Sequence, residues 1–123
     1  MRKKLGFTLV ELMVVMTVIA LLLSVVVPDY MGKTRRAEEA VLQENLAIMR
    51  DALDKHYADA GKYPGTLDEL VTKRYLRSIP RDPLTQKAQW QVVAPQDPQK
   101  GGVYDIHSSA KGTGTNGTPY AQW

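Results

Sequence analysis

Hydrophobic and polar positions divide the chain into an apolar N-terminal run and a longer mixed remainder. From Phe7 to Val27 nearly every residue is apolar, and these 21 residues would form a helix about 32 Å long. The hydrocarbon core of a bilayer is about 30 Å thick, so the run predicts a membrane-spanning helix. A secretory signal peptide has a shorter apolar core followed by a small-residue cleavage site, a pattern that this run lacks.

Residues 29–61 show the pattern of an amphipathic helix. Apolar side chains recur three and four positions apart, which predicts one buried face. Gly61 follows the pattern as a helix terminator. The predicted stripe consists of Leu42, Leu46, Met49, Leu53 and Tyr57, widened by Val41, Ile48 and Ala52.

Polar positions in the same segment predict a solvated face. Arg35 and Glu39 are four residues apart, as are Asp51 and Lys55, so each pair would be adjacent on a helix surface. Pro28 separates the two helical patterns. Because proline lacks a backbone donor, it predicts either a helix end or an interruption of a helix that then continues.

Residues 62–123 predict a small α/β region with a C-terminal loop. Tyr63-Pro64-Gly65 is a turn signal, and Thr66 to Glu69 match a capping box that starts a short helix through about Tyr75. Alternating segments at Trp90–Val93 and Val103–His107 predict two strands. The predicted fold class is therefore α+β, with a long N-terminal helix packed on a small antiparallel sheet.

The distribution of charge argues against a nucleic-acid-binding face. The chain has 16 Lys and Arg residues, 13 Asp and Glu residues and no cysteine. Three basic residues, Arg2, Lys3 and Lys4, precede Gly6, and the 13 that remain equal the acidic residues in number. Basic residues before an apolar span place the N-terminus in the cytoplasm, so the rest of the chain is predicted beyond the membrane.

Glu11 is the one charged residue within the apolar run. A charged side chain at the centre of a membrane helix costs about 2.5–3.5 kcal/mol on insertion scales, and less near the interface. Acids in such places usually have a partner and a role. A residue this close to the start of the run can also reach the headgroups, which is the simpler alternative.

The segment Gly6-Phe7-Thr8-Leu9-Val10-Glu11, between a basic leader and the apolar run, resembles the class III signal of type IV pilins and pseudopilins. The resemblance implies that a prepilin peptidase removes residues 1–6 by cutting after Gly6. It also implies that the new N-terminus, Phe7, is N-methylated. Residues 7–28 would then form a transmembrane helix in the free subunit and the core of a filament.

The same resemblance gives Glu11 a role, because the fifth residue of the mature chain in this family is a glutamate. Its carboxylate would pair with the Phe7 amine of a neighbouring subunit and fix the axial stagger between helices. Such a pair is stronger in a low-dielectric bundle than in water. In the family a proline at the place of Pro28 interrupts a helix that continues, and this region could melt locally in a filament.

Three later stretches, ending with Trp123, resemble a narrower group, the major pseudopilins of type II secretion systems. The resemblance implies a homopolymer that pushes folded proteins through an outer-membrane channel. Implied partners are minor pseudopilins or pilins, the prepilin peptidase and an inner-membrane assembly platform. The subunit would cross the inner membrane once, with residues 62–123 in the periplasm, and its filament would lie in the periplasm or at the cell surface. The stretches are Gly61–Pro64, Tyr75–Pro83 and Gly102–Ile106.

Two other functions remain open from the sequence. One is a subunit of a type IV pilus for adhesion, motility or DNA uptake. The other is a membrane-anchored binding domain that never polymerises. An enzyme is not predicted, since the sequence contains no catalytic or phosphate-binding motif. His56 and His107 show no metal-ligand pattern, and the helix acids Glu38 and Glu39 are predicted on the surface.

Major pseudopilins commonly hold a calcium ion in the loop after the last strand. Calcium takes about six to eight oxygen ligands, usually including carboxylates. No Asp or Glu follows Asp105, so Ser108, Thr113 and Asn116 would offer only a weak, neutral site together with main-chain carbonyls. We therefore predict neither a calcium site nor another cofactor.

Overall fold

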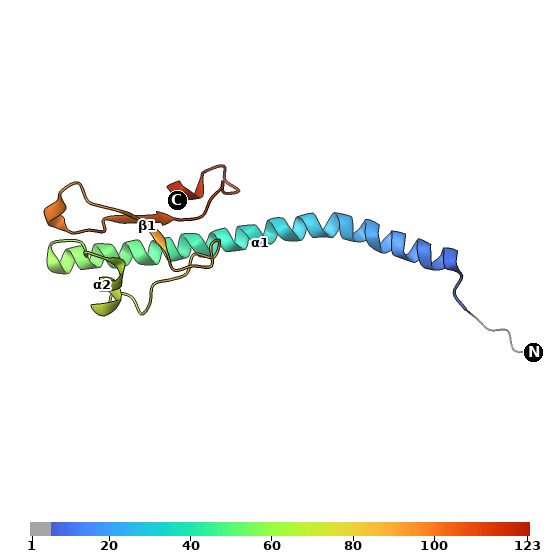
Figure 1. Ribbon diagram of the computed structural model, residues 1–123, viewed down its shortest axis with the longest axis horizontal. Helices are drawn as coiled ribbons and strands as arrows, with labels where there is room; N and C mark the ends of the chain where they lie inside the picture. Colours follow the sequence, from blue (N-terminus) through green and yellow to red (C-terminus); the bar gives the residue numbers. More distant parts are fainter. Residues whose placement is uncertain (1–5) are drawn as a thin grey trace, which may run out of the picture. The chain divides into compact units, whose positions relative to one another are not determined.

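The computed structural model describes residues 6–123, except for the side chains of residues 29 and 31. The basic residues Arg2, Lys3 and Lys4, with the rest of the predicted leader up to residue 5, therefore lie outside the described residues. The chain divides into two units between Arg35 and Arg36. Helix α1 (Leu9–Ala60) passes through this boundary, and the other described helices and strands belong to the C-terminal unit, residues 36–123 (Figure 1).

Helix α1 begins with a side-chain cap. The Thr8 hydroxyl oxygen accepts a hydrogen bond from the Glu11 N–H at 3.1 Å, which satisfies one of the free donors of the first turn. Glu11 itself lies in this first turn, where the helix dipole favours a negative charge. The spacing from Thr8 to Glu11 is that of a capping box, so these residues also act as a helix-start signal.

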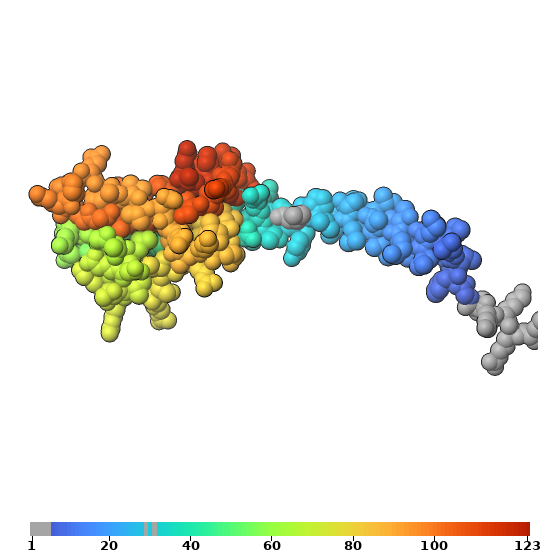
Figure 2. Space-filling model, in the orientation of Figure 1, coloured from blue at the N-terminus to red at the C-terminus, as the bar shows by residue number. Residues whose placement is uncertain are grey.

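The first half of α1 is apolar on all sides. By length and composition it can cross a membrane. Its large apolar side chains are exposed and are not buried against other described residues of the chain (Figure 2). The hydroxyls of Thr17 and Ser24 donate to carbonyls of their own helix, Met13 at 2.8 Å and Leu21 at 2.7 Å. These bonds lower the cost of placing hydroxyl groups where no water can reach them.

Helix α1 continues without a break through Pro28. A proline cannot donate to the carbonyl four residues earlier, so this turn has one backbone hydrogen bond fewer than a regular turn. The alternative that the helix ends at Pro28 is wrong for the single chain, and an interruption within a filament stays a prediction.

The second half of α1 carries the predicted apolar stripe, although the stripe is narrower than expected. Val41 and Ile48 are exposed, and Tyr57 is half-buried. A sheet of only two strands covers a limited width of the helix, which leaves these flanking positions in contact with solvent. The buried residues of the stripe are Leu42, Leu46, Met49, Ala52 and Leu53.

The predicted turn between the helices is present, but its hydrogen bonds differ from the prediction. Gly61 follows the end of α1 with a φ of 72°, a left-handed conformation that glycine adopts without strain. Helix α2 (Leu67–Thr72) starts where predicted and is shorter. Thr66 makes no side-chain cap, and the Glu69 carboxylate instead accepts from the Gly65 N–H at 2.6 Å.

Strands β1 (Trp90–Val93) and β2 (Asp105–Ser108) pair antiparallel, with Trp90 opposite Ser108. Strand β1 has its predicted bounds, whereas β2 begins two residues later than predicted. The reason is that the Val103 N–H donates to the Pro64 carbonyl at 3.0 Å, so it is bonded to the turn after α1 and not to strand β1. Short 3₁₀ helices η1 (Pro98–Lys100) and η2 (Tyr120–Gln122) flank the second strand.

One hydrophobic core joins these elements to α1. The sheet and the C-terminal segment lie beside the green and teal part of the helix (Figure 1). This arrangement of a long helix against a small antiparallel sheet confirms the predicted α+β, pilin-like fold. Besides the helix stripe, the core contains Leu70, Leu76, Trp90, Val103, Ile106 and Tyr120.

Candidate assembly site

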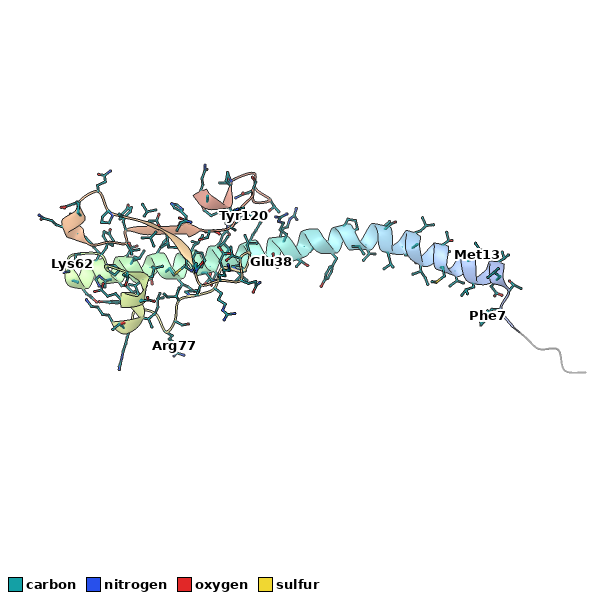
Figure 3. All side chains as sticks on the ribbon, viewed as in Figure 1. Phe7, Met13, Glu38, Lys62, Arg77 and Tyr120 are labelled. Carbon is teal, nitrogen blue, oxygen red and sulfur yellow. The ribbon has the colours of Figure 1, made fainter. Side chains whose placement is uncertain are left out.

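The predicted cleavage site lies outside regular secondary structure. Gly6 and Phe7 precede α1, and the Phe7 side chain is 89% exposed. Figure 3 shows Phe7 next to the first turn of the helix. Because no helical hydrogen bond has to open at the bond between them, this peptide can enter the cleft of a peptidase without local unfolding.

The predicted partner of the new amine, Glu11, is exposed in the first turn of α1. Within residues 6–123, no hydrogen bond or ion pair of its carboxylate to another side chain is found. Cleavage would therefore leave both a positive amine and a negative carboxylate at one end of the same helix. A copy shifted along the helix axis could bring the two opposite charges together.

An apolar surface follows these two charges along the helix. Side chains from Leu9 to Val27 are about half to three-quarters exposed, for example Leu9 at 76% and Val25 at 74%. A continuous exposed apolar surface of this length marks a contact with a membrane or with other proteins. The structure therefore supplies a chemically distinct end and an apolar shaft on one helix.

The three oxygen-bearing residues considered for calcium do not fit a calcium site. Ser108 is buried, and its hydroxyl donates to the Asp82 carboxylate at 2.5 Å. The Asn116 side-chain oxygen accepts from the Thr118 N–H at 2.9 Å, and Thr113 forms a β-bridge with Pro119. In the described part of the chain, no three potential His, Cys, Asp or Glu ligands come together.

The sequence prediction missed Glu39, which is buried at 5% exposure and does not lie on a solvated face. Its carboxylate accepts from the Thr115 N–H at 2.9 Å, from the Thr115 hydroxyl at 2.5 Å and from the Tyr120 hydroxyl at 2.7 Å. The prediction that Glu39 is a surface acid is therefore wrong. Its position three residues before Leu42 places it on the side of the apolar stripe, and that spacing was the available signal.

Arg50 is a second charged residue of α1 that holds distant segments. Its Nε pairs with Asp105 at 2.8 Å, and its Nη2 donates to the main-chain oxygens of Ile106 at 2.9 Å and Trp123 at 2.7 Å. The pair Asp51–Lys55, at 2.9 Å, is exposed as predicted. Charged residues of α1 thus serve both the surface and the interior of the C-terminal unit.

The two histidines make separate structural contacts. His56 is fully buried, and its Nδ1 lies 2.7 Å from the Lys62 carbonyl oxygen, which requires this nitrogen to carry the proton. Its Nε2 lacks a hydrogen-bond partner among the described residues and lies 3.9 Å from Glu69. His107 contacts the Trp123 main-chain oxygen at 2.7 Å. Neither contact resembles a metal site or a catalytic pair.

Comparison with known proteins agrees with this arrangement. Residues 1–27 match the prokaryotic N-terminal methylation motif. The chain is 31% identical to type II secretion system core protein G of Vibrio cholerae, over 94% of this chain and 91% of that protein. The chain belongs to the type II secretion system core protein G family. It is also 33% identical to core protein G of Klebsiella michiganensis, over 93% and 85% of the two chains.

Membership of the core protein G family confirms the resemblance to major pseudopilins that the sequence predicted. The protein of Escherichia coli in the same family is 32% identical over 87% of this chain and 81% of its own. No solved structure matches the chain. Gly6, Phe7 and Glu11 all lie inside the matched methylation motif, and together with the family they identify a pilin-like filament subunit.

Proposed function

We propose that this chain is the major pseudopilin of a type II secretion system and polymerises through its N-terminal helices to drive protein export. The observation that carries the proposal is the exposed apolar half of α1 with one carboxylate in its first turn. Membership of the core protein G family and the match to the methylation motif support a structural task.

Processing prepares the helix end for assembly. A prepilin peptidase removes residues 1–6 by cutting after Gly6, and the Phe7 amine is then methylated. N-methylation preserves the positive charge of an amine. The exposed, non-helical position of Gly6 and Phe7 supports this step.

Assembly then brings the Phe7 amine of one copy to the Glu11 carboxylate of the next. Leaving either charge buried and unpaired costs several kcal/mol, so only the stagger that pairs them is stable. The apolar surface from Phe7 to Val27 passes from lipid to neighbouring helices and is never exposed to water. The charge pair therefore sets the register, while the apolar contacts hold the filament together.

The parts of the chain take separate roles in this scheme. Residues 7–28 form the transmembrane helix and then the filament core, residues 29–61 carry the amphipathic helix, and residues 62–123 form the periplasmic part. The subunit waits in the inner membrane with its N-terminus in the cytoplasm. Copies of itself, minor pseudopilins, the prepilin peptidase and an inner-membrane platform are its partners.

The test is the substitution Glu11→Gln, which removes the charge and keeps the size of the side chain. We expect a folded, inserted subunit whose yield in sheared or cross-linked filaments falls at least about tenfold, because one charge pair of ~1.4 kcal/mol already changes an equilibrium tenfold. Glu44→Gln, at an exposed position of the same helix, is the matched control. Normal filament yield from the Glu11 variant would refute the pairing.

Two further measurements separate the alternatives. Mass spectrometry of the membrane form should show a methylated Phe7 as the first residue, whereas an intact Met1 would favour a plain membrane anchor. Deleting the gene should abolish secretion. Loss of twitching or of DNA uptake with secretion intact would instead indicate a type IV pilus.

A further inference from the structure

The loop between β2 and η2, residues 109–119, is closed by its own hydrogen bonds. The Gly114 N–H donates to Thr118 O at 2.9 Å, and the Gly117 N–H donates to Gly114 O at 3.0 Å. The Tyr120 N–H donates to Gly112 O at 3.1 Å. Each of these three carbonyl oxygens therefore accepts a hydrogen bond from the loop or from the residue that follows it.

The Trp123 indole packs against the same loop and fixes its shape. Its Nε1 donates to Thr118 O at 3.0 Å. A Cβ added at Gly114 would lie 2.5 Å from the Trp123 ring, so glycine at this position allows the close approach. The loop is thus a compact unit, and Trp123 connects it to α1 through the hydrogen bond from Arg50.

Glu39 provides a connection of this loop to α1. Three donors from two separate positions, Thr115 and Tyr120, converge on its carboxylate. Figure 3 shows Tyr120 beside the turn of α1 that carries Glu38. A buried carboxylate is stable when several donors surround it, and such charge-assisted bonds are about twice as strong as neutral ones.

We propose that the Glu39 carboxylate is the anchor of the C-terminal loop, and that the order of this loop is independent of calcium. The two oxygens of the Glu39 carboxylate, on α1, accept hydrogen bonds from donors of the loop and of Tyr120. A calcium site would instead require oxygen atoms of the loop to bind a cation. The loop contains no Asp or Glu that could bind a cation, its order comes from the hydrogen bonds described above, and the Ser108 hydroxyl donates to Asp82. This inference concerns the fold of the C-terminal unit and does not depend on filament assembly.

Cleavage by trypsin after Lys111, which is exposed in the loop, reports on loop order. The full chain is held in detergent micelles, and the fragment that begins at Gly112 is followed by mass spectrometry. Glu39→Gln should speed this cleavage by at least about tenfold, because a lost charge-assisted bond of ~1.5 kcal/mol raises the open population by that factor. Glu44→Gln, five residues along α1 and exposed, should cleave like the parent.

A second variant keeps the proposal testable if Glu39→Gln fails to fold. Tyr120→Phe retains the buried ring and removes only one donor to Glu39, so it should speed cleavage at Lys111 by a smaller factor with normal circular dichroism. Unchanged cleavage in a folded Glu39→Gln or Tyr120→Phe protein would overturn the anchor.

Calcium provides the second arm of the test. The protein is first treated with a chelator and is then measured without calcium and with about 5 mM calcium, a concentration above the dissociation constants of weak calcium sites, ~10⁻⁴–10⁻³ M. The rate of cleavage at Lys111 and the thermal midpoint should be the same in the two conditions. Protection of Lys111 by calcium, or a rise in the thermal midpoint, would overturn the claim of independence. Equal values in both conditions support it.

Discussion

At the scale of single residues, the C-terminal unit depends on polar side chains that are buried and bonded. Asp82 is fully buried, and its carboxylate accepts from the Leu84 N–H at 2.8 Å and from the Ser108 hydroxyl at 2.5 Å. His56 is equally buried and contacts the Lys62 carbonyl. Removing one partner of such a bond leaves a buried polar group unsatisfied, which costs about 1–3 kcal/mol.

Glu69 makes the C-terminal unit less stable at acidic pH than at neutral pH. The hydrogen bond from the Gly65 N–H, followed by the bond to Lys73, holds the pKa of Glu69 below its ordinary value of 4.5. The lowered pKa means that Glu69 stabilises the fold above about pH 4.5, and that this contribution is lost as the pH falls through its folded pKa. Glu69→Gln should flatten the fall of the thermal midpoint below about pH 4.5.

Thermal unfolding followed by circular dichroism between about pH 3 and 7 measures this effect. Glu44→Gln is a control, because it is exposed on α1, and it should leave the acid limb of the curve as steep as in the parent. An acid limb that is equally steep in the Glu69 variant would contradict the prediction.

The residues that could be predicted from the sequence are those whose partners are local. Asp51 and Lys55 are four apart on a helix, so their contact follows from helix geometry alone. The partners of Glu39 lie more than seventy positions away, and no local pattern indicates them. The charge of Glu39 therefore predicted a surface position, whereas in the structure Glu39 is buried and bonded to Thr115 and Tyr120.

At the scale of elements, the end of α1 and the bounds of β1 followed from local signals, whereas the end of α2 and the start of β2 did not. Gly61 ends α1 because its left-handed φ is a property of glycine itself. The start of β2 is instead decided by Pro64, whose carbonyl takes the N–H groups of Gly102 and Val103 at 3.0 Å each. Two stretches that resemble pseudopilins, Gly61–Pro64 and Gly102–Ile106, thus contact each other directly.

The close approach of these two stretches predicts a strong effect of a methyl group. A Cβ at Gly102 would lie 2.4 Å from the Gly65 carbonyl oxygen, so Gly102→Ala must push the two backbones apart. We expect a loss of about 2–3 kcal/mol and a thermal midpoint lower by roughly 10–20 °C. Circular dichroism of the full chain in micelles measures it.

The facing glycine is the matched control for this substitution. A Cβ at Gly65 would have Glu69 Oε2 as its nearest neighbour at 3.6 Å, an ordinary contact. Gly65→Ala should therefore shift the midpoint by less than about 4 °C, which corresponds to less than ~1 kcal/mol. Equal shifts in the two variants would show that the backbones do not approach as closely as described.

At the scale of the whole molecule, one helix serves two environments. The first half of α1 is apolar on every side, and the second half buries a stripe under a small sheet. Pro28 lies between these halves, within a helix that the single chain keeps continuous. Since proline in a helix interior is less favourable than alanine by about 3 kcal/mol, its presence favours a role outside the single subunit.

Pro28→Ala tests whether a filament needs the helix to open at this position. We expect unchanged folding of the C-terminal unit, at least the parent helical content, and a lower filament yield, because a stiffer helix resists the local interruption. Val27→Ile, a conservative change at the adjacent position, should assemble normally. A normal filament yield from Pro28→Ala would show that the interruption is not required.

The inward hydrogen bonds of Thr17 and Ser24 have a consequence for the energetics of extraction. Because both hydroxyls are satisfied within their own helix, the segment needs no new polar partner when its surroundings change from acyl chains to protein. Apolar side chains gain no hydrophobic free energy on moving between two apolar media. In the proposed assembly, the hydrophobic effect would therefore not by itself favour the filament over the bilayer, and packing between the helices and the pair of Phe7 and Glu11 would have to do so.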